Sequence, residues 1–396
     1  MSDLKIFSKY TDIKDKRIIV RLDLNVPIKN SRIEDDTRIK VIQPFINKLI
    51  ENKAKVILLS HLGRPNGKVV SELSLKPIYD YLEKNLNGKI YFYKDKIDDK
   101  AVLASNKLKS GEVLLIENIR FFKEEEEDEE IFSKNLAKLG HIYINEAFSC
   151  SHRKQASMHN ITKFVDSYGG PLLEKEFQSI NLIIKNKKKP VTCIIGGSKV
   201  STKINILSSL SEKADNLVIV GAMANNFLKF EGVNVGISLV EKGSENVVKN
   251  IKILAKKSKC NLITPVDFQT STDFNGNPNY KPLKDIGSKD MILDIGKNTI
   301  NLITKIIDDS GTVFWNGPAG YYENKNFSTG TLSIGKKIAE NTKLKSLISI
   351  VGGGDTISAI KNAGLENVFT HLSTAGGAFL ESLEGKDLPG IKVLKK

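Results

Sequence analysis

A glycine- and lysine-containing segment near the middle of the chain has the residue types of a phosphate site. An apolar run, Val191 to Ile195, ends at a glycine pair that is followed by Lys199 and Lys203. Glycines let a ligand approach the backbone, and a helix N-terminus presents unpaired N–H groups to anions. Residues four apart share one face of a helix, so both ammonium groups are expected on one side. The segment is interpreted either as a polyphosphate site or as an ordinary strand-to-helix turn with a solvated lysine face.

Arginines near the ends of apolar runs in the first half of the chain form a second set of candidate ligand-binding residues. Arginine suits a bidentate grip on carboxylate or phosphate. Guanidinium groups that converge on one edge repel each other unless an anion compensates their charge. A single arginine could simply form a surface pair, as Arg21 or Arg38 could with Asp35 or Asp36, but the whole set predicts a site for a small polyanion. The segments that follow the four runs are Arg21-Leu22-Asp23-Leu24-Asn25, His61-Leu62-Gly63-Arg64, Glu117-Asn118-Ile119-Arg120 and Asn145 through His152-Arg153.

An alternation of strands and helices must position these segments. Short apolar runs end in glycine, asparagine or charged residues, and helical periodicity follows each of them. This pattern is typical of a parallel, doubly wound sheet, in which ligands bind at the carboxyl ends of the strands. We predict an α/β fold with two doubly wound parallel-sheet (Rossmann-like) domains joined by a helical hinge. In the first half the predicted strands are 18–22, 56–59, 113–116 and 142–144, with helices over 38–52 and 75–86.

The strand ends of the second half are rich in glycine and poor in arginine. Glycine turns admit a flat base and a polyphosphate close to the backbone. Asp355 could orient a metal held by phosphates or cap a helix, and Glu323 could accept from ribose hydroxyls. The spacing matches neither a P-loop nor a dinucleotide fingerprint. The turns are Gly196-Gly197-Ser198-Lys199, Gly221-Ala222-Met223-Ala224, Trp315-Asn316-Gly317-Pro318, Gly352-Gly353-Gly354-Asp355-Thr356 and Ser373-Thr374-Ala375-Gly376-Gly377.

Composition limits the class of protein. A chain of 396 residues with 40% hydrophobic and 27% charged residues is typical of a globular protein with two domains. The net charge of +14 is compatible with nucleic acid or with anionic metabolites, but the lysines are scattered, and we expect no nucleic-acid partner. We expect no membrane segment and no signal peptide. Three cysteines without metal-ligand or CxxC spacing suit a cytoplasmic location.

A segment rich in glycine and proline in the middle of the chain indicates a domain boundary. Tyr168-Gly169-Gly170-Pro171 precedes an amphipathic helix over 172–185, which we interpret as the connector. A helical connector is stiffer than a Gly/Ser linker and suits a hinge. The predicted domains are 1–168 with the tail from about 385 to 396, the hinge 169–186, and 187–384.

The histidines near Cys150 are not expected to bind a metal, and the acidic run is not expected to be catalytic. For His61, a structural hydrogen bond and a ligand contact both remain open. His152 and His159 lack convincing ligand geometry with Cys150, so no metal is expected there. The acidic run Glu124 to Glu130 is interpreted as a solvated loop or helix start, because such a block repels itself.

Two unlike halves, one for a polyanion and one for a nucleotide, predict phosphoryl transfer between them. An acceptor hydroxyl would need a base within hydrogen-bond reach, whereas a carboxylate is already ionised at neutral pH. The arginine-rich half offers one suitable carboxylate, Asp23, which could instead bind a substrate hydroxyl. These residue types favour an acceptor that needs charge neutralisation.

Seven segments, in order, resemble the signature segments of the phosphoglycerate kinase family. The resemblance runs from about residue 15 to the end of the chain. It implies reversible phosphoryl transfer between 1,3-bisphosphoglycerate and MgADP, giving 3-phosphoglycerate and MgATP, in glycolysis and gluconeogenesis, by a cytoplasmic monomer. The segments are Arg21-Leu-Asp-Leu-Asn-Val-Pro27, His61-Leu-Gly-Arg-Pro65, Glu117-Asn-Ile-Arg-Phe121, Gly196-Gly-Ser-Lys-Val-Ser-Thr-Lys203, Trp315-Asn-Gly-Pro318, Gly352-Gly-Gly-Asp-Thr356 and Leu383-Glu-Gly-Lys386.

The resemblance also implies roles for individual residues. It assigns 3-phosphoglycerate to Asp23, Leu24, Asn25, Arg38, His61, Leu62, Gly63, Arg64, Arg120 and Arg153. It assigns the nucleotide to Gly197, Lys199, Lys203, Asn316, Glu323, Gly353, Gly354, Asp355 and Thr356, with Mg²⁺ held mainly by nucleotide phosphates near Asp355. The implied catalytic residues are Arg38, Lys199, Lys203 and Gly377. Arg38 and Lys203 are expected to flank the transferred group, Lys199 to hold phosphates that do not move, and domain closure to expel water. The C-terminal tail is expected to pack on the first domain.

Some positions depart from the family pattern. Glu146 stands where aspartate is usual, Ser149-Cys150 replaces Gly-Thr, Lys297 replaces a proline, and Ala375 replaces the first glycine of a phosphate-facing turn. Alanine is tolerated there only if its φ is negative. Two alternatives to the kinase are a basic nucleic-acid-binding protein and a kinase of this architecture that acts on another small carboxylate. The number of arginines favours an acceptor with a second anionic group.

Overall fold

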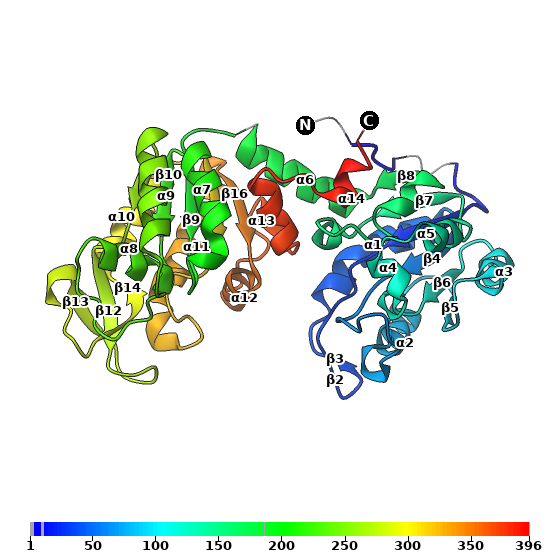
Figure 1. Ribbon diagram of the computed structural model, residues 1–396, viewed down its shortest axis with the longest axis horizontal. Coiled ribbons are helices and arrows are strands. Elements are labelled where there is room, and N and C mark those ends of the chain that lie inside the picture. The colour runs from blue at the N-terminus through cyan, green and yellow to red at the C-terminus, as the bar shows by residue number, and fades with distance from the viewer. Residues whose placement is uncertain (1–3, 9–11, 186, 396) are drawn as a thin grey trace. The chain divides into compact units, whose positions relative to one another are not determined.

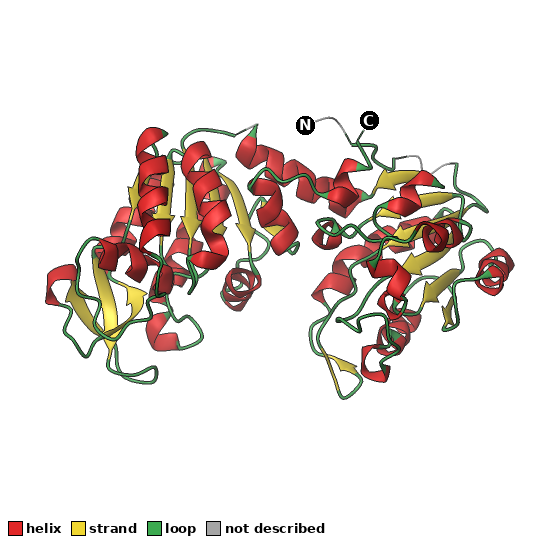
Figure 2. Ribbon diagram, viewed as in Figure 1, coloured by secondary structure: helices red, strands yellow, loops and turns green. Residues whose placement is uncertain are grey.

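The chain folds into two compact units, which we describe separately. The computed structural model describes residues 4–8, 12–185 and 187–395. The first unit runs to Phe177 and includes the residues from Asp387 onward, and the second runs from Gln178 to Lys386. Both are mixed α/β structures in which helices cover strands (Figures 1 and 2).

A six-stranded parallel sheet forms the centre of the first unit. Strand β1 is central and pairs in parallel with β4 on one side and with β7 on the other. The order of the strands therefore reverses beside β1. Ligands of doubly wound sheets bind at such a switch point. In spatial order the strands are β5 (Ile90–Tyr93), β6 (Val113–Ile116), β4 (Lys55–Leu59), β1 (Arg17–Arg21), β7 (Ile142–Asn145) and β8 (Asp166–Gly169).

Both faces of this sheet are buried. Along β1, Ile18 and Val20 join one apolar cluster, and Ile19 between them joins another on the opposite face. The first cluster includes residues of α1 (Thr37–Glu51) and α2 (Lys76–Asn85), and the second includes residues of α3 (Asp99–Lys107) and α5 (Glu130–Ala137). Two helical layers therefore hold the strand ends in place. A short helix α4 (Lys123–Glu126) and a hairpin of β2 (Ile28–Lys29) and β3 (Arg32–Ile33) complete the described α-helices and strands before β8.

The second unit is built on another six-stranded parallel sheet, with β9 and β15 at its centre. Trp315 of β15 packs with residues of α10, α11 and α12, and Phe314 meets Phe379 of α13 on the other face. In spatial order the strands are β11 (Asn261–Ile263), β10 (Asn216–Ile219), β9 (Val191–Ile195), β15 (Thr312–Asn316), β16 (Ile348–Gly352) and β17 (His371–Ser373). The helices are α7 (Ile204–Lys213), α8 (Ala224–Phe230), α9 (Glu245–Lys257), α10 (Lys297–Asp309), α11 (Thr329–Lys345), α12 (Gly354–Asn362) and α13 (Gly377–Leu383).

A small antiparallel sheet in the second unit was not predicted. Its order is β13 (Asn279–Pro282), β12 (Asp267–Ser271) and β14 (Met291–Ile295), and Phe268 and Ile292 pack in its own apolar cluster. The fold class is confirmed, but the second unit is more than a doubly wound sheet.

Helix α6 (Pro171–Ile184) contains the division between the units, which falls after Phe177. The buried Glu146 carboxylate accepts hydrogen bonds from the Leu172 and Leu173 backbone N–H groups, at 2.8 and 3.1 Å, and so satisfies the start of this helix. Burial raises the pKa of Glu146 to about 8.

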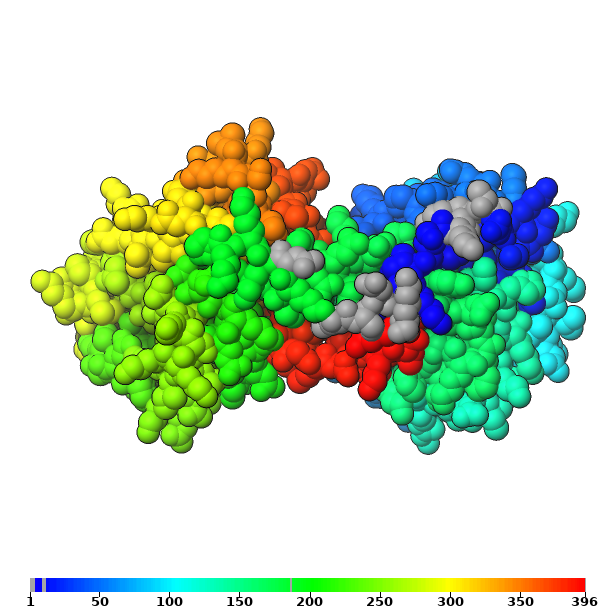
Figure 3. All heavy atoms as spheres, turned by 90° about the horizontal axis from the view of Figure 1, so that it is seen from above, coloured from blue at the N-terminus to red at the C-terminus, as the bar shows by residue number. Residues whose placement is uncertain are grey.

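The C-terminal segment belongs to the first unit. Helix α14 (Pro389–Lys392) packs beside the segment Phe148–Cys150, and the Gly390 N–H donates to the Ser151 carbonyl at 2.9 Å. Leu4 and Lys395 form an antiparallel bridge, which places both ends of the described chain side by side (Figures 1 and 3).

Candidate active site

Three loops at the carboxyl edge of the first sheet are tied to one another by hydrogen bonds. Asn25 Oδ1, after β1, accepts from the Gly63 N–H at 2.9 Å, after β4. The Arg120 guanidinium, after β6, donates to the Gly63 carbonyl at 2.9 Å. Asn118 Nδ2 donates to the Leu62 carbonyl at 2.7 Å, which adds a second hydrogen bond to the loop after β4. The predicted residues Asn25, Gly63 and Arg120 are therefore brought together.

Asp23 and Arg38 form an ion pair at this edge. The Arg38 guanidinium donates to the Asp23 carboxylate, which also accepts from the Ser149 hydroxyl. The Arg38 side chain is 35% exposed, so the pair faces solvent on one side. Ser149 is a departure from the family pattern, and its hydroxyl adds a third group to the pair.

Four guanidinium groups surround His61. Burial lowers the pKa of His61 well below its usual value, and the charges of Arg21, Arg120, Arg38 and Arg153 lower it further. The imidazole is therefore neutral, and the excess positive charge is suited to an anion. The four arginines come from the end of β1, the first turn of α1, the 3₁₀ turn after β6 and the segment after β7.

One member of the acidic run is buried beneath this cluster, contrary to the sequence interpretation. Glu125 is fully buried and accepts from the Ser157 N–H at 2.8 Å and from the Ser157 hydroxyl at 2.6 Å. Burial raises the pKa of Glu125 to about 7, while the charges of Arg21 and Arg120 oppose that shift. Arg21 donates to the same Ser157 hydroxyl at 2.8 Å. The run was expected to be solvated as a block, but helix α4 turns this one carboxylate inward towards the arginines.

The remaining predicted residues of this half lie at the same edge with different exposure. Leu24 and Leu62 are buried in the apolar core, so only their backbone groups can meet a ligand. Arg64 is exposed and Arg153 is half-buried.

In the second unit, the segment after β9 differs from the predicted strand-to-helix turn. Strand β9 ends at Ile195 as predicted, but α7 begins only at Ile204, after a loop and a single 3₁₀ turn over Ser201–Lys203. Lys199 is exposed in the loop and outside any helix. The expectation that Lys199 and Lys203 share a helix face is therefore wrong, because Lys199 precedes the 3₁₀ turn and Lys203 precedes α7.

Lys203 instead points back towards the ends of the strands. Its Nζ donates to the Gly196 carbonyl and to Asn316 Oδ1, each at 2.7 Å. Burial lowers the pKa of Lys203 to about 8, and Asp355 partly opposes this shift. A half-buried ammonium at the strand ends is suited to donate hydrogen bonds to phosphate oxygens.

Asn316 connects Lys203 to the glycine turn after β16. Gly353 has φ +96°, and a Cβ on it would lie 2.9 Å from Asn316 Nδ2. In the same turn the Thr356 hydroxyl accepts from the Gly317 N–H at 2.7 Å. Gly353 is the N-cap of α12, and Asp355 is exposed in its first turn, so Asp355 is not the helix cap.

A pocket of about 530 Å³ in the second unit joins several predicted residues to an apolar wall. Gly197, Glu323 and Asp355 line it together with Leu293, Tyr321 and Pro318, among others. A lining that combines apolar side chains with a few polar groups suits a base and ribose with phosphates. This unit thus offers a nucleotide-sized cavity beside Lys203.

The turn before α13 leaves its backbone accessible. Gly376 has φ +55°, Gly377 begins α13, and nothing lies within 4 Å of a Cβ built on either. Ala375 is not among the described non-glycine residues with positive φ, which agrees with the condition set for alanine there.

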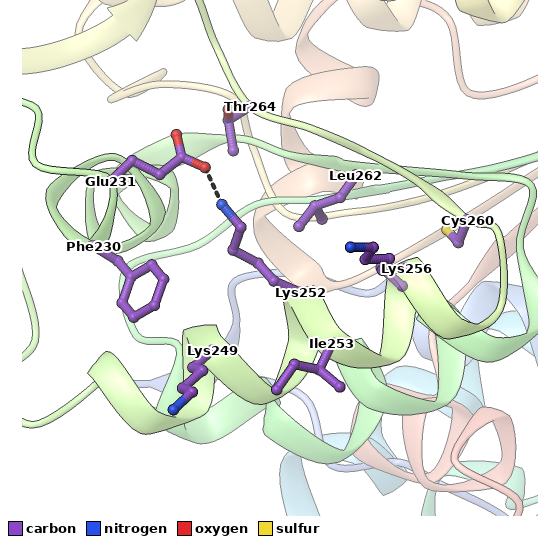
Figure 4. A pocket seen from close by; sticks show the side chains of 10 residues that line it. Phe230, Glu231, Lys249, Lys252, Ile253, Lys256, Cys260, Leu262 and Thr264 are labelled. Carbon is purple, nitrogen blue, oxygen red and sulfur yellow. Dashed lines mark hydrogen bonds and ion pairs between the residues drawn. The ribbon is translucent and has the colours of Figure 1, made fainter.

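A second cavity of about 410 Å³ contains none of the predicted site residues. It lies between α8, α9 and β11, where Lys249, Lys252 and Lys256 border Phe230 and Ile253 (Figure 4). Lys252 is paired with Glu231, so the charge of one of the three ammonium groups that line the cavity is already compensated.

Comparisons with known proteins agree on one family. The sequence pattern described as "Phosphoglycerate kinase" matches residues 8–386. A protein named phosphoglycerate kinase from Rhizobium meliloti (strain 1021) is 43% identical over 394 residues, covering 99% of each chain. One from Wolbachia sp. subsp. Drosophila simulans (strain wRi) is 42% identical over 388 residues, covering 97% of each chain.

Solved structures show the same similarity. The structure of phosphoglycerate kinase from Coxiella burnetii has a TM-score of 0.89 at 38% identity and covers 97% of each chain. That from Pyrococcus horikoshii OT3 has a TM-score of 0.81 at 30% identity, covering 97% of this chain and 96% of the other.

Proposed function

Because this chain belongs to the phosphoglycerate kinase family, we propose that its two units divide one reaction between them. The activity of the family is a phosphotransfer with a carboxyl group as acceptor, between 1,3-bisphosphoglycerate and ADP, giving 3-phosphoglycerate and ATP. The proposal concerns the residues that perform it. In it, residues 1–168 with the tail from about 385 bind 3-phosphoglycerate, residues 169–186 form the hinge, and residues 187–384 bind the nucleotide.

The arginine cluster supports the assignment of 3-phosphoglycerate to the first unit. Four guanidiniums around a neutral His61 leave an excess of positive charge, which a carboxylate and a phosphate would neutralise. Asp23, paired with Arg38, would accept from the substrate hydroxyl. The backbone at Leu24, Leu62 and Gly63 would border the ligand, with Asn25, Arg64, Arg120 and Arg153 completing the site.

The pocket beside Lys203 supports the assignment of the nucleotide to the second unit. Its apolar wall would hold the base, and Glu323 would accept from ribose hydroxyls. Lys199, Asn316 and the turn from Gly353 to Thr356 would meet phosphates that stay on the nucleotide. Gly197, whose φ is +127°, would let the ligand approach the backbone.

Charge stabilisation accounts for the transfer step. A carboxylate acceptor needs no base at neutral pH, and the first unit offers guanidiniums instead. Arg38 and Lys203 would stabilise the charge on the phosphoryl group in transfer, and the accessible amides at Gly377 would meet its oxygens. Hinge closure through α6 would exclude water from the reacting groups.

Magnesium would accompany the nucleotide, held mainly by its phosphates. Asp355 suits this role, because it is exposed in the first turn of α12 and lines the nucleotide-sized pocket. Among the described residues, Asp355 belongs to no cluster of three or more metal-ligating groups, which fits an ion that keeps most of its ligands from phosphate and water. The ion would neutralise charge on the phosphates.

We further propose that the protein acts in the cytoplasm as a monomer. No described helix has the length and apolar character needed to cross a membrane.

The buried His61 with the charges of four arginines acting on it is the feature that carries the assignment, and a coupled assay tests it. ATP and 3-phosphoglycerate, with glyceraldehyde-3-phosphate dehydrogenase as coupling enzyme, should oxidise NADH only when Mg²⁺ is present. An Arg120→Ala variant should raise the KM for 3-phosphoglycerate about tenfold or more, since a charged hydrogen bond contributes about 1.5–3 kcal/mol. An unchanged KM would contradict the assignment.

A further inference from the structure

The cavity bordered by α8, α9 and β11 has the size of a small-molecule site. Its volume is about 410 Å³, and small-molecule sites commonly measure about 300–1,000 Å³. Helix α9 borders it together with Phe230 at the end of α8 and Leu262 on β11, the edge strand of the second sheet (Figure 4). Its lining residues differ from those of the nucleotide-sized pocket. The cavity is therefore a separate candidate site.

Part of the lining is apolar and accessible to solvent. Phe230 is 38% exposed and Ile253 is 53% exposed, although both are large apolar side chains. Leu262 of the same lining is half-buried, and Ala255 and Cys260 are buried. Apolar side chains that border one hollow gain free energy when a ligand removes them from water. The lining therefore favours a ligand with an apolar body.

The charged part of the lining is mainly positive. Lys249, Lys252 and Lys256 all border the cavity, because spacings of three and four residues place side chains on one side of a helix. The only acid of the lining, Glu231, is paired with Lys252. Lys249 and Lys256 are exposed and form no ion pair with an acid in the described part of the chain. Two positive charges of the lining are therefore left for an anion to neutralise.

We propose that this cavity binds a small organic anion with an apolar body, such as an aromatic or medium-chain carboxylate. The carboxylate meets Lys249 and Lys256, while the apolar body packs against Phe230 and Ile253. A free small molecule fits better than a membrane surface, because the charged and apolar groups border a hollow of small-molecule size. This binding does not rest on the proposed function, since none of these residues belongs to the proposed active site.

Anilinonaphthalene sulfonate, an aromatic anion whose fluorescence rises in apolar surroundings, tests the cavity on the full chain. With MgADP added to fill the nucleotide-sized pocket, the dye should bind saturably. Octanoate should displace it, whereas octylammonium, which has the same chain and the opposite charge, should not. The double variant Lys249→Glu, Lys256→Glu should raise the Kd of the dye about tenfold or more. Lys257→Glu is a matched control, because Lys257 also lies in the last turn of α9 but does not line the cavity. It should change the Kd by about twofold at most at physiological salt.

Circular dichroism and kinase activity of the variants should match those of wild type, which shows that the charge changes leave the fold intact. The proposal is overturned if wild-type protein does not bind the dye saturably, if the double variant binds it as tightly, or if Lys257→Glu weakens binding equally. Sedimentation with phosphatidylglycerol vesicles that depends on Lys249 and Lys256 would assign these lysines to a membrane surface and would also overturn it. Protein that binds the dye through these lysines but has no kinase activity would support the site and overturn the proposed function.

Discussion

The Nζ of Lys203 lies 2.7 Å from Oδ1 of Asn316, although 113 residues separate them in the chain. One follows β9 and the other ends β15, and these strands are neighbours in the second sheet. The pair places a half-buried ammonium beside the glycine turn at Gly353. It is the most specific feature of the proposed nucleotide site.

Nucleotide binding should be accompanied by proton uptake near pH 8. Burial lowers the pKa of Lys203 to about 8, so about half of the free protein lacks this proton at that pH. Nearby phosphates favour the ammonium form and raise its pKa. Calorimetry of ADP binding in buffers of different ionisation enthalpy should give an uptake of about half a proton at pH 8 and almost none at pH 6.5.

Lys203→Met should abolish this uptake, and Lys199→Met in the same loop should retain it. Uptake that persists in Lys203→Met would assign the proton to another group.

Gly353→Ala should weaken nucleotide binding by disturbing Asn316. The residue has φ +96°, and the new Cβ would lie 2.9 Å from Asn316 Nδ2. We expect the KM for ATP to rise about tenfold, with a loss of stability of about 1–2 kcal/mol from the backbone conformation. Gly232→Ala is a matched control, because Gly232 has φ +81° with nothing within 4 Å. Equal effects on KM in both variants would exclude the role of Asn316.

Glu146→Gln should change how stability depends on pH. The pKa of Glu146 is about 8 when folded and near 4.5 when unfolded, so the folded state holds the extra proton between these values. Wild-type stability therefore falls as pH rises from 5 to 8, by up to about 1.4 kcal/mol per pH unit. Glutamine has no such proton but keeps an acceptor for the Leu172 and Leu173 N–H groups.

Urea unfolding at pH 5 and pH 8 measures this difference. The variant should gain stability relative to wild type by about 2 kcal/mol or more between the two pH values. Parallel pH profiles for the two proteins would show that Glu146 is ionised in the folded state.

The sequence predicts the inner strands of the first parallel sheet, because they are short apolar runs buried on both faces, but not the partly exposed edge strands β5 and β8. Val113–Ile116 and Val191–Ile195 are strands with the predicted bounds. Antiparallel β12 is different, since Asp267 and Gln269 interrupt its apolar residues and Asp267 is buried by capping α10 through the Thr299 N–H. Its hydrophobic pattern is too short and too polar to predict. The turn around Asn275-Gly276 is the signal that could have indicated a hairpin.

Side-chain direction was the part of the site that spacing could not predict. Lys203 was placed one helical turn beyond Lys199, but a loop replaces that turn and Lys203 folds back on Gly196. Glu125 looked like its acidic neighbours, and only the packing of α4 distinguishes it. The bond between Asp23 and Ser149 joins residues 126 positions apart, so no local pattern reveals it. The ends of the predicted strands indicated where the site lies, whereas the contacts within it depend on tertiary packing.

Steady-state kinetics of Arg38→Ala test the central claim, that an arginine at this edge stabilises the transferred charge. With Mg²⁺, ATP and 3-phosphoglycerate, kcat should fall by about a hundredfold or more, while each KM changes by a few fold, because the lost interaction is strongest in the transition state. Arg64→Ala should instead raise mainly the KM for 3-phosphoglycerate. A kcat for Arg38→Ala equal to that of wild type would contradict the account.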